Sequence, residues 1–102
     1  MKKVTLFVGL TDKDTHFREI ETVTAYKVVT RLVAETVGGG TVSTADGIYT
    51  HDDGTVVIEK SFRIEILDAD ESAVSALVAD LKKLLNQESV LVQREKVETA
   101  FI

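Results

Sequence analysis

One long β-hairpin is predicted by residues 40–67, which read GTVSTADGIYTHDDGTVVIEKSFRIEIL. Asp53 and Gly54 mark its tip, because Gly, and to a lesser degree Asp, tolerates the positive φ of a tight turn. The second arm has about a dozen residues, so at ~3.3 Å per residue it extends on the order of 40 Å. That exceeds the usual length of a globular strand. A small domain does not easily cover both sides of such an arm, which favours a partner along it.

The composition is that of one ordinary globular domain, residues 1–102. Hydrophobic residues make up 44% of the chain, which is enough for a core, and cysteine is absent, which excludes a thiolate metal site or nucleophile. The net charge of −5 argues against extended nucleic-acid binding, since that needs a basic surface. No apolar run is long enough to span a membrane and no signal-peptide pattern precedes the first strand, so we expect a cytoplasmic protein without a membrane partner.

Two helices and two further strands are predicted around the hairpin. Residues 4–10 alternate as a strand, and residues 19–37 carry an apolar stripe of helical spacing that ends at Gly38, a left-handed cap. The clearest helix spans residues 71–85. Residues 89–95 predict the last strand, which residues 96–102 either extend or follow with a short extra strand.

The residues at both ends of the second predicted helix are of types that favour helix termini. Asp68 or Asp70 can accept hydrogen bonds from its first free N–H groups, Glu71 complements the positive end of its dipole, and Asn86 is a suitable cap after it.

This order predicts an α+β fold, a ferredoxin-like βαββαβ plait with a four-stranded antiparallel sheet, two helices on one face and a long hairpin between the second and third strands. The second face of the sheet then has no cover within the chain, and its mixed apolar content favours a sheet-to-sheet contact or a ligand surface. The chain ends on Phe101 and Ile102, which we expect to be buried or to lie between subunits. The apolar residues expected on or near the uncovered face are Phe7, Ala45, Tyr49, Val57 and Leu67.

Three patterns invite a chemical interpretation, and each has a simpler structural one. His51, Asp52 and Asp53 resemble metal ligands, but Asp is favoured at turns for backbone reasons. The glycines at 38–40 resemble a phosphate cradle, but they leave a helix instead of entering one. His16 has no identifiable nucleophile beside it, which favours a loop histidine. We therefore predict no catalytic residue, no metal and no cofactor.

Four hairpin residues are the candidate ligand-binding set: Thr41, Tyr49, Lys60 and Arg63. Lys60 interrupts the apolar face of the second arm. It is either a lysine beyond the core, with its stem over apolar atoms, or a cation at a subunit groove that holds an anionic ligand.

The arginines of the sheet have an alternative role. Arg63 and Arg94 can pair with Glu65 and Glu95 instead of binding a ligand.

The strand order, the protruding hairpin and the size resemble the trimeric PII signalling proteins and the related CutA-like plaits. More locally, residues 7–10, 40–41, 45–49, 54 and 57–61 (FVGL, GT, ADGIY, G and VIEKS) resemble a small bacterial and phage family of unknown function. The PII resemblance implies an oligomer that binds nucleotides or other small effectors in clefts between subunits. The chain lacks the PII loop signature and the nucleotide-site motifs, so it carries over no PII site residue.

The first functional hypothesis is a non-enzymatic homo-oligomer, a dimer or trimer, that binds a small anionic ligand, such as a nucleotide or signal molecule, or a protein partner. The alternative is a small enzyme on the same fold, an isomerase, a monooxygenase-like enzyme or a hydrolase that uses His16, Asp46 or Arg63. A third hypothesis is a phage-type inhibitor or sponge of a host factor.

Overall fold

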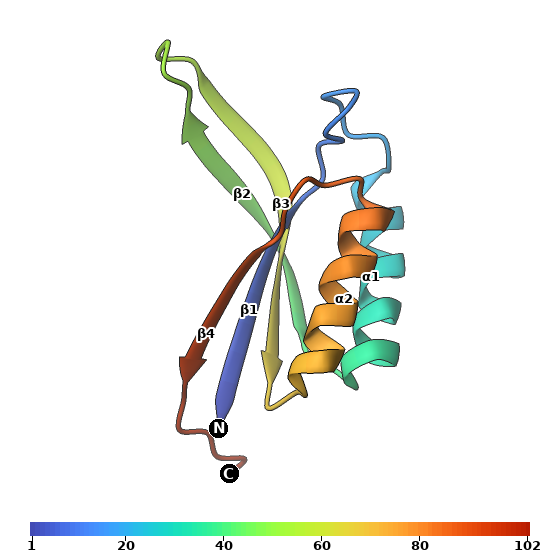
Figure 1. Cartoon of the computed structure of the whole chain (residues 1–102), viewed down its shortest axis with the longest axis vertical. Coiled ribbons are helices and arrows are strands. Elements are labelled where there is room, and N and C mark those ends of the chain that lie inside the picture. The colour runs from blue at the N-terminus through green and yellow to red at the C-terminus, as the bar shows by residue number, and fades with distance from the viewer.

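The computed structural model describes residues 1–102 as one sheet with two helices on the same side of it (Figure 1). The helices lie side by side, and the hairpin projects away from them at the end opposite the two termini. The elements in chain order are β1 (Lys2–Gly9), α1 (Thr22–Val37), β2 (Thr41–Thr50), β3 (Val56–Leu67), α2 (Glu71–Leu84) and β4 (Leu91–Lys96).

The sheet is antiparallel throughout, with the strand order β2-β3-β1-β4. This confirms the predicted α+β, ferredoxin-like βαββαβ plait. No helix of the chain combines the length and the apolar character needed to cross a lipid bilayer.

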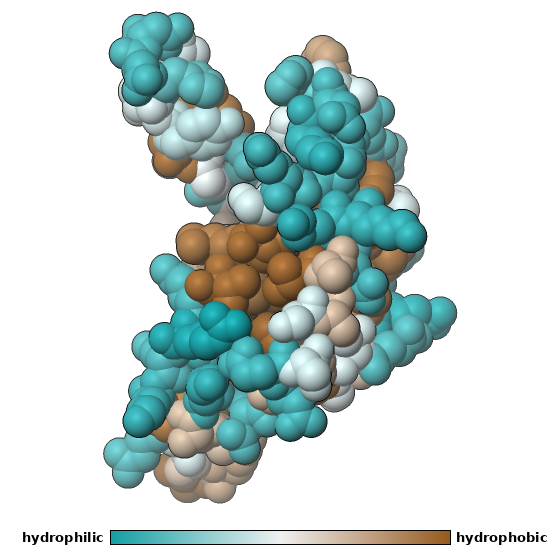
Figure 2. Space-filling model, in the orientation of Figure 1, coloured by the Kyte–Doolittle hydropathy of each residue, from teal (hydrophilic) through white to brown (hydrophobic).

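The core fills the space between the helices and one face of the sheet. Side chains alternate between the two faces of a strand, so every second residue of β1 and β3 points toward the helices. Figure 2 shows apolar side chains gathered near the centre of the view, between the hairpin and the helices, while the hairpin tip is hydrophilic. The buried core residues are Val4, Leu6, Val8, Leu10, Ala25, Val29, Val33, Phe62, Ile64, Ile66, Val74, Leu77, Leu81 and Leu85.

α1 ends at the predicted Val37 and α2 begins at the predicted Glu71, whereas the start of α1 and the capping of α2 differ from the predictions. Gly38 has a φ of 86° and its N–H donates to the Ala34 carbonyl at 3.1 Å, so it is the left-handed cap of α1. α1 begins at Thr22 instead of residue 19, because side-chain hydrogen bonds such as Thr15 Oγ1 to Glu19 hold the preceding residues in a loop. Asp70 occupies the N-cap position of α2, yet its side chain accepts no capping hydrogen bond.

The hairpin extends past the end of β1. Register pairs Gly9 with Ser61, and Leu10 adds one more bond by donating its N–H to the Lys60 carbonyl at 2.9 Å. β3 residues nearer the tip pair with β2 alone. Toward its tip, the hairpin is therefore a two-stranded ribbon, which matches the predicted protruding arm.

The tip of the hairpin is wider than the expected two-residue Asp-Gly turn. His51 N–H donates to the Thr55 carbonyl at 2.8 Å, and Gly54 N–H donates to the His51 carbonyl at 2.9 Å. Gly54 has a φ of 90°, but Asp53 stays out of the positive-φ region. The Asp53 carboxylate instead accepts the Thr55 N–H at 2.9 Å, which holds the pKa of that carboxyl below its usual range. Asp53 is favoured at this position because its carboxylate accepts that N–H. The turn is a three-residue loop, residues 52–54, that ends on a left-handed glycine.

The C-terminal segment after β4 forms no further strand. Val97 N–H donates to the Met1 carbonyl at 2.9 Å, and the chain then continues without regular structure. Phe101 and Ile102 are fully exposed on the single chain, so the expected burial within the chain is wrong. Their place between subunits stays a prediction.

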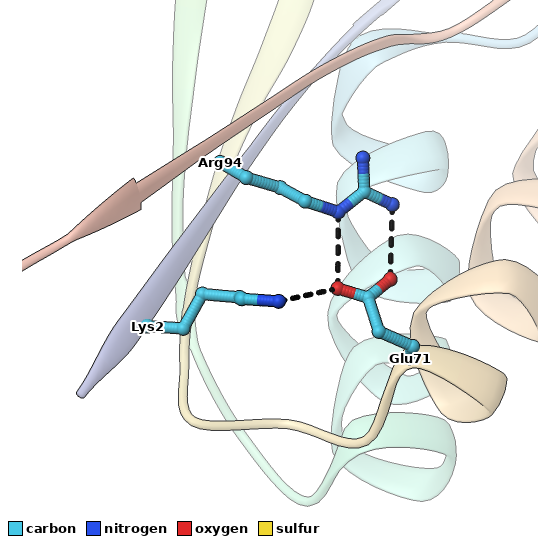
Figure 3. A network of polar contacts seen from close by, with 3 residues as sticks. All are labelled: Lys2, Glu71 and Arg94. Carbon is cyan, nitrogen blue, oxygen red and sulfur yellow. Dashed lines mark hydrogen bonds and ion pairs between the residues drawn. The ribbon is translucent and has the colours of Figure 1, made fainter.

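Glu71, the first residue of α2, links that helix to the neighbouring strands β1 and β4 (Figure 3). Its carboxylate accepts two hydrogen bonds from Arg94 of β4, at 3.0 and 2.9 Å, and one from Lys2 of β1 at 3.2 Å. Arg94 thus pairs with Glu71 and not with Glu95, because Arg94 lies on the helix side of β4 and Glu95 on the other. The hydrogen bonds from Arg94, and then from Lys2, lower the pKa of Glu71 to about 2.

This network predicts a pH-dependent contribution to stability. The pKa of Glu71 is depressed from its usual 4.5, so the contribution is complete above about pH 4.5 and is lost as the pH falls toward 2. Urea unfolding of the wild type should show a free energy of unfolding that decreases over this window, and Glu71→Gln should flatten that decrease. Glu98→Gln, which removes a carboxylate outside any ion pair, should leave it in place. Identical pH profiles for Glu71→Gln and the wild type would contradict this role.

Candidate functional site

The sheet face opposite the helices carries a wide cleft of about 620 Å³ near the base of the hairpin arm. A volume of this size suits a small-molecule ligand. The residues that line the cleft are Phe7, Gly9, Lys13, Gly47, Tyr49, Glu59, Ser61, Gln87, Glu88, Ser89 and Leu91.

Four separate segments build this cleft because the register aligns them. β1 supplies its floor where it pairs with β3, and the projecting hairpin forms one wall. Lys13, in the loop after β1, and the residues between α2 and β4 form the opposite wall. The cleft therefore lies where the arm leaves the sheet.

Glu59 and Gly9 make the closest approach in the cleft. A Cβ atom on Gly9 would lie 2.5 Å from the Cδ atom of Glu59, so only glycine leaves room for that carboxylate. Glu59 Oε2 accepts the N–H of Thr11 at 3.1 Å. The backbone just after β1 thus fixes a half-buried carboxylate across the floor of the cleft.

The charge environment of Glu59 differs from that of the rest of the sheet. The other charged side chains of β1, β2 and β3 all take part in ion pairs, whereas Glu59 accepts a single backbone hydrogen bond. Its carboxylate therefore remains available to a cation that enters the cleft. The paired residues are Lys2, Lys3, Asp46, Lys60, Arg63 and Glu65.

Aromatic side chains stand beside this carboxylate. Phe7 is half-buried on the floor, and Tyr49 on the arm is 49% exposed. The Tyr49 ring packs edge-on against His51, with ring centroids 5.4 Å apart. Aromatic faces of this kind pack well against a planar heterocycle and attract a cation.

The predicted ligand-binding residues do not converge on one site. Tyr49 lines the cleft, but Thr41 lies at the other end of β2, about 26 Å away at ~3.3 Å per residue. Arg63 pairs with Glu65 on the open face, as the ion-pair alternative predicted. Lys60 lies on the helix side of the arm, where its Nζ is 3.0 Å from Asp46 Oδ1. Whether any of the four binds a ligand stays a prediction.

A second cleft of about 740 Å³ opens at the opposite end of the sheet. Its charged pair, Lys3 and Glu65, is already joined at 3.3 Å. One wall is the irregular C-terminal segment, which includes Phe101. This cleft presents no carboxylate without a cation partner, so the cleft around Glu59 is the better candidate for binding a cation.

A model of the S-adenosylmethionine lyase family matches residues 12–102, nearly the whole chain. The chain belongs to the S-adenosylmethionine lyase family. The resemblance to PII and CutA-like proteins is therefore limited to the plait fold, while the expected relation to a small phage family is supported. A search of curated proteins gave no significant match.

Solved structures similar to this lyase-family chain confirm the fold. A phage SAM lyase in complex with S-methyl-5′-thioadenosine has a TM-score of 0.66 and 24% identity, and the match covers 93% of this chain and 80% of that one. A phage SAM lyase in the apo state has a TM-score of 0.63 and 22% identity, over 92% and 78% of the two chains. A DUF3240 family protein from Shewanella baltica has a TM-score of 0.52 and 11% identity, over 99% and 94%. At these identities, the matches establish the fold alone.

Sequence reasoning missed Glu59 and Gly9 as partners. Both lie in stretches that it quoted for the family resemblance, FVGL and VIEKS, but it singled out Lys60 and not its neighbour. The alternation of β3 already placed Glu59 on the uncovered face. The register pairs Gly9 with Ser61, and only the three-dimensional structure shows that the Glu59 side chain reaches back over Gly9.

The close approach predicts a local effect of substitution. Gly9→Ala should displace the Glu59 carboxylate from the Thr11 N–H, because the two groups cannot occupy the same space. The far end of a side chain is what moves, so the melting temperature should change by only about 4 °C or less. The ¹⁵N–¹H signal of Thr11 should shift markedly in Gly9→Ala.

Gly47→Ala is the matched control, since Gly47 lines the same cleft and its added Cβ would meet nothing closer than 3.5 Å. It should leave the Thr11 signal in place. An unchanged Thr11 signal in Gly9→Ala would contradict the close approach.

Proposed function

We propose that this protein is an S-adenosylmethionine lyase that releases 5′-methylthioadenosine from its substrate. The observation that carries the proposal is the family match over residues 12–102. The phage neighbour bound to S-methyl-5′-thioadenosine supports it, because that compound is the thioether left when the amino-acid part of S-adenosylmethionine is removed. The enzyme hypothesis therefore replaces the non-enzymatic one as the preferred function.

The charges of the cleft suit this substrate. S-adenosylmethionine carries a sulfonium cation, an α-ammonium group and a carboxylate, so its net charge is positive. The cleft contributes Glu59 and Glu88 against the single cation of Lys13. We place the sulfonium near Glu59, the carboxylate without an ion-pair partner, and the adenine against Tyr49 or Phe7. The anionic ligand expected from the sequence stays untested, and these charges favour a cationic one.

The reaction needs no group beyond the substrate itself. A carboxylate oxygen of the substrate attacks its own Cγ, forming a C–O bond as the Cγ–S bond breaks. The electron pair of the broken bond stays on sulfur, which becomes the neutral thioether, and the four-carbon part leaves as homoserine lactone. No proton is transferred. An elimination would instead require a base to remove an unactivated Cβ hydrogen, which makes the internal attack the easier route.

The cleft promotes this step through position and polarity. The negative carboxylate and the positive sulfonium neutralise one another in the transition state, so a site that excludes water favours it. Phe7, Tyr49 and Leu91 supply the apolar part of that surface. Holding the substrate folded, with carboxylate and Cγ aligned, removes most of the entropic barrier. Glu59 binds the charged substrate more strongly than the neutral thioether, which helps the product to leave.

The residues proposed earlier for other chemistries do not fit this cleft. His16 lies in the loop after β1 and is not among the cleft residues. Asp46 pairs with Lys60 on the helix side of the arm, and Arg63 pairs with Glu65. No observation favours an isomerase, a monooxygenase-like enzyme or a hydrolase over a lyase. A role as inhibitor or sponge stays a separate hypothesis.

The activity is tested by incubating the purified protein with S-adenosylmethionine and following methylthioadenosine and homoserine lactone by mass spectrometry. The wild type should form both in equal amounts without incorporating ¹⁸O from labelled water into the freshly formed lactone. Glu59→Gln should lower kcat/KM by roughly 10- to 1,000-fold, because it leaves the sulfonium without its counter-charge. Glu98→Gln should keep wild-type activity.

Two results would contradict the proposal. One is the absence of methylthioadenosine from the wild-type reaction. The other is unchanged turnover in Glu59→Gln, which would place the chemistry elsewhere on the sheet.

We also propose that the chain forms a homo-oligomer, a dimer or trimer. Ile48, Val56 and Ile58 are exposed on the arm by 69%, 59% and 67%, and the terminal Phe101 and Ile102 are exposed as well. Such a set of apolar side chains on a projecting ribbon favours contact with another copy. Light scattering at micromolar concentration should give a mass of two or three chains. A monomer there, unchanged when residues 101–102 are removed, would contradict the proposal.

A further inference from the structure

Two chain segments far apart in sequence form the wall of the cleft opposite the arm. Residues 11–15 follow β1, and residues 86–89 join α2 to β4. Asn86 Nδ2 donates to Asp12 Oδ1 at 2.9 Å and to Asp14 Oδ2 at 2.8 Å. Lys13 N–H donates to the Asn86 carbonyl at 3.0 Å. We call these two segments, joined in this way, the latch.

Asp12 is the centre of the latch. Its Oδ1 atom accepts the N–H of Asp14 at 2.8 Å, the N–H of Thr15 at 3.1 Å and the amide of Asn86. The backbone N–H groups of Thr15 and Asp14 hold the pKa of the Asp12 carboxyl below its usual range.

Asn86 reaches Asp12 from an unusual backbone conformation. Its φ is 46°, the left-handed conformation that asparagine adopts directly after a helix, as its predicted role as a cap implies. The Gln87 side chain adds a further link between the segments by donating to the Thr11 carbonyl at 2.6 Å. Asp12 and Asn86 supply the remaining side-chain bonds between them.

The latch presents two opposite charges to the cleft. Lys13 of the first segment and Glu88 of the second both line the cleft. Gln87 and Ser89 line the cleft beside Glu88. Neither Lys13 nor Glu88 takes part in an ion pair within the chain, in contrast to most charged residues of the sheet. A cation and an anion held on one wall match a ligand that carries a carboxylate and an ammonium group close together.

We propose that the latch is the subsite for the α-amino-acid end of the substrate, with Lys13 binding its carboxylate and Glu88 its ammonium group. This inference rests on the proposed lyase function. Asp12 and Asn86 touch no substrate and are positioning residues, because they fix the two segments that carry Lys13 and Glu88. A carboxylate has two oxygen atoms, so Lys13 can hold one while the other faces Cγ.

Two stable ligands separate this subsite from the rest of the cleft. S-adenosylhomocysteine keeps the amino-acid end and lacks the sulfonium, so it is not cleaved, and methylthioadenosine lacks the amino-acid end altogether. Isothermal titration of the full chain with each ligand measures the two affinities. Lys13→Met should weaken S-adenosylhomocysteine binding about threefold to tenfold and leave methylthioadenosine binding unchanged. Lys27→Met, on the exposed side of α1, should change neither.

The positioning role is tested by a double-mutant cycle. Asp12→Ala should weaken S-adenosylhomocysteine binding as much as Lys13→Met does, and the double variant should show no further loss, since both changes remove the same contact. Retained methylthioadenosine binding in each variant shows that the cleft is still folded. Rescue by Asp12→Asn, which keeps an acceptor oxygen for the Asn86 amide, should be partial.

Three results would overturn the subsite. They are an equal loss of both ligands in Lys13→Met, no loss of either, and additive effects in the double variant. If the wild type binds neither ligand, the proposed function itself fails. A wild type that binds both ligands but is insensitive to Lys13 contradicts only the subsite.

Discussion

The placement of both helices on one face of the sheet is the constraint on which the rest of this structure depends. It buries alternate residues of β1 and β3, such as Leu6 and Ile64, and leaves the intervening residues of the same strands on an uncovered face. The candidate cleft occupies that face, where the projecting hairpin adds a second wall.

On that face, the glycine at position 9 controls where the Glu59 carboxylate lies. Gly9 allows the Glu59 carboxylate to cross the floor, and the adjacent Thr11 N–H holds it there. The strand ladder fixes both partners, so the site needs no flexible loop at its centre. The loops contribute instead at the rim, where Asp12 and Asn86 join two segments that the sequence separates by more than seventy residues. A floor held by strand pairing and a rim held by hydrogen bonds between loops suit a reaction that depends on the folded shape of its substrate.

The sequence predicted the fold well because its signals are local and repeated. Alternation along residues 56–67 identified β3, and the stripe of residues such as Leu77 and Leu81 identified α2. The errors fell at the ends of elements, where short-range side-chain hydrogen bonds decide. Side-chain hydrogen bonds delay the start of α1 to Thr22, and the Thr55 N–H, which donates to the Asp53 carboxylate, accompanies the wider hairpin tip.

The site was less predictable for a related physical reason. Tyr49 was selected correctly as a residue of the open face, but Lys60 was selected because it interrupted an apolar pattern, and it proves to pair with Asp46 on the opposite side. Glu59 interrupts no pattern, and only its contacts with Gly9 and the Thr11 N–H distinguish it. A crystal structure of the protein with methylthioadenosine would locate the binding site. We expect the ligand on the open face, with its sulfur beside Glu59 and its adenine against Tyr49 or Phe7. A ligand bound instead in the cleft between Lys3 and Phe101, or on the helix side of the sheet, would contradict that expectation.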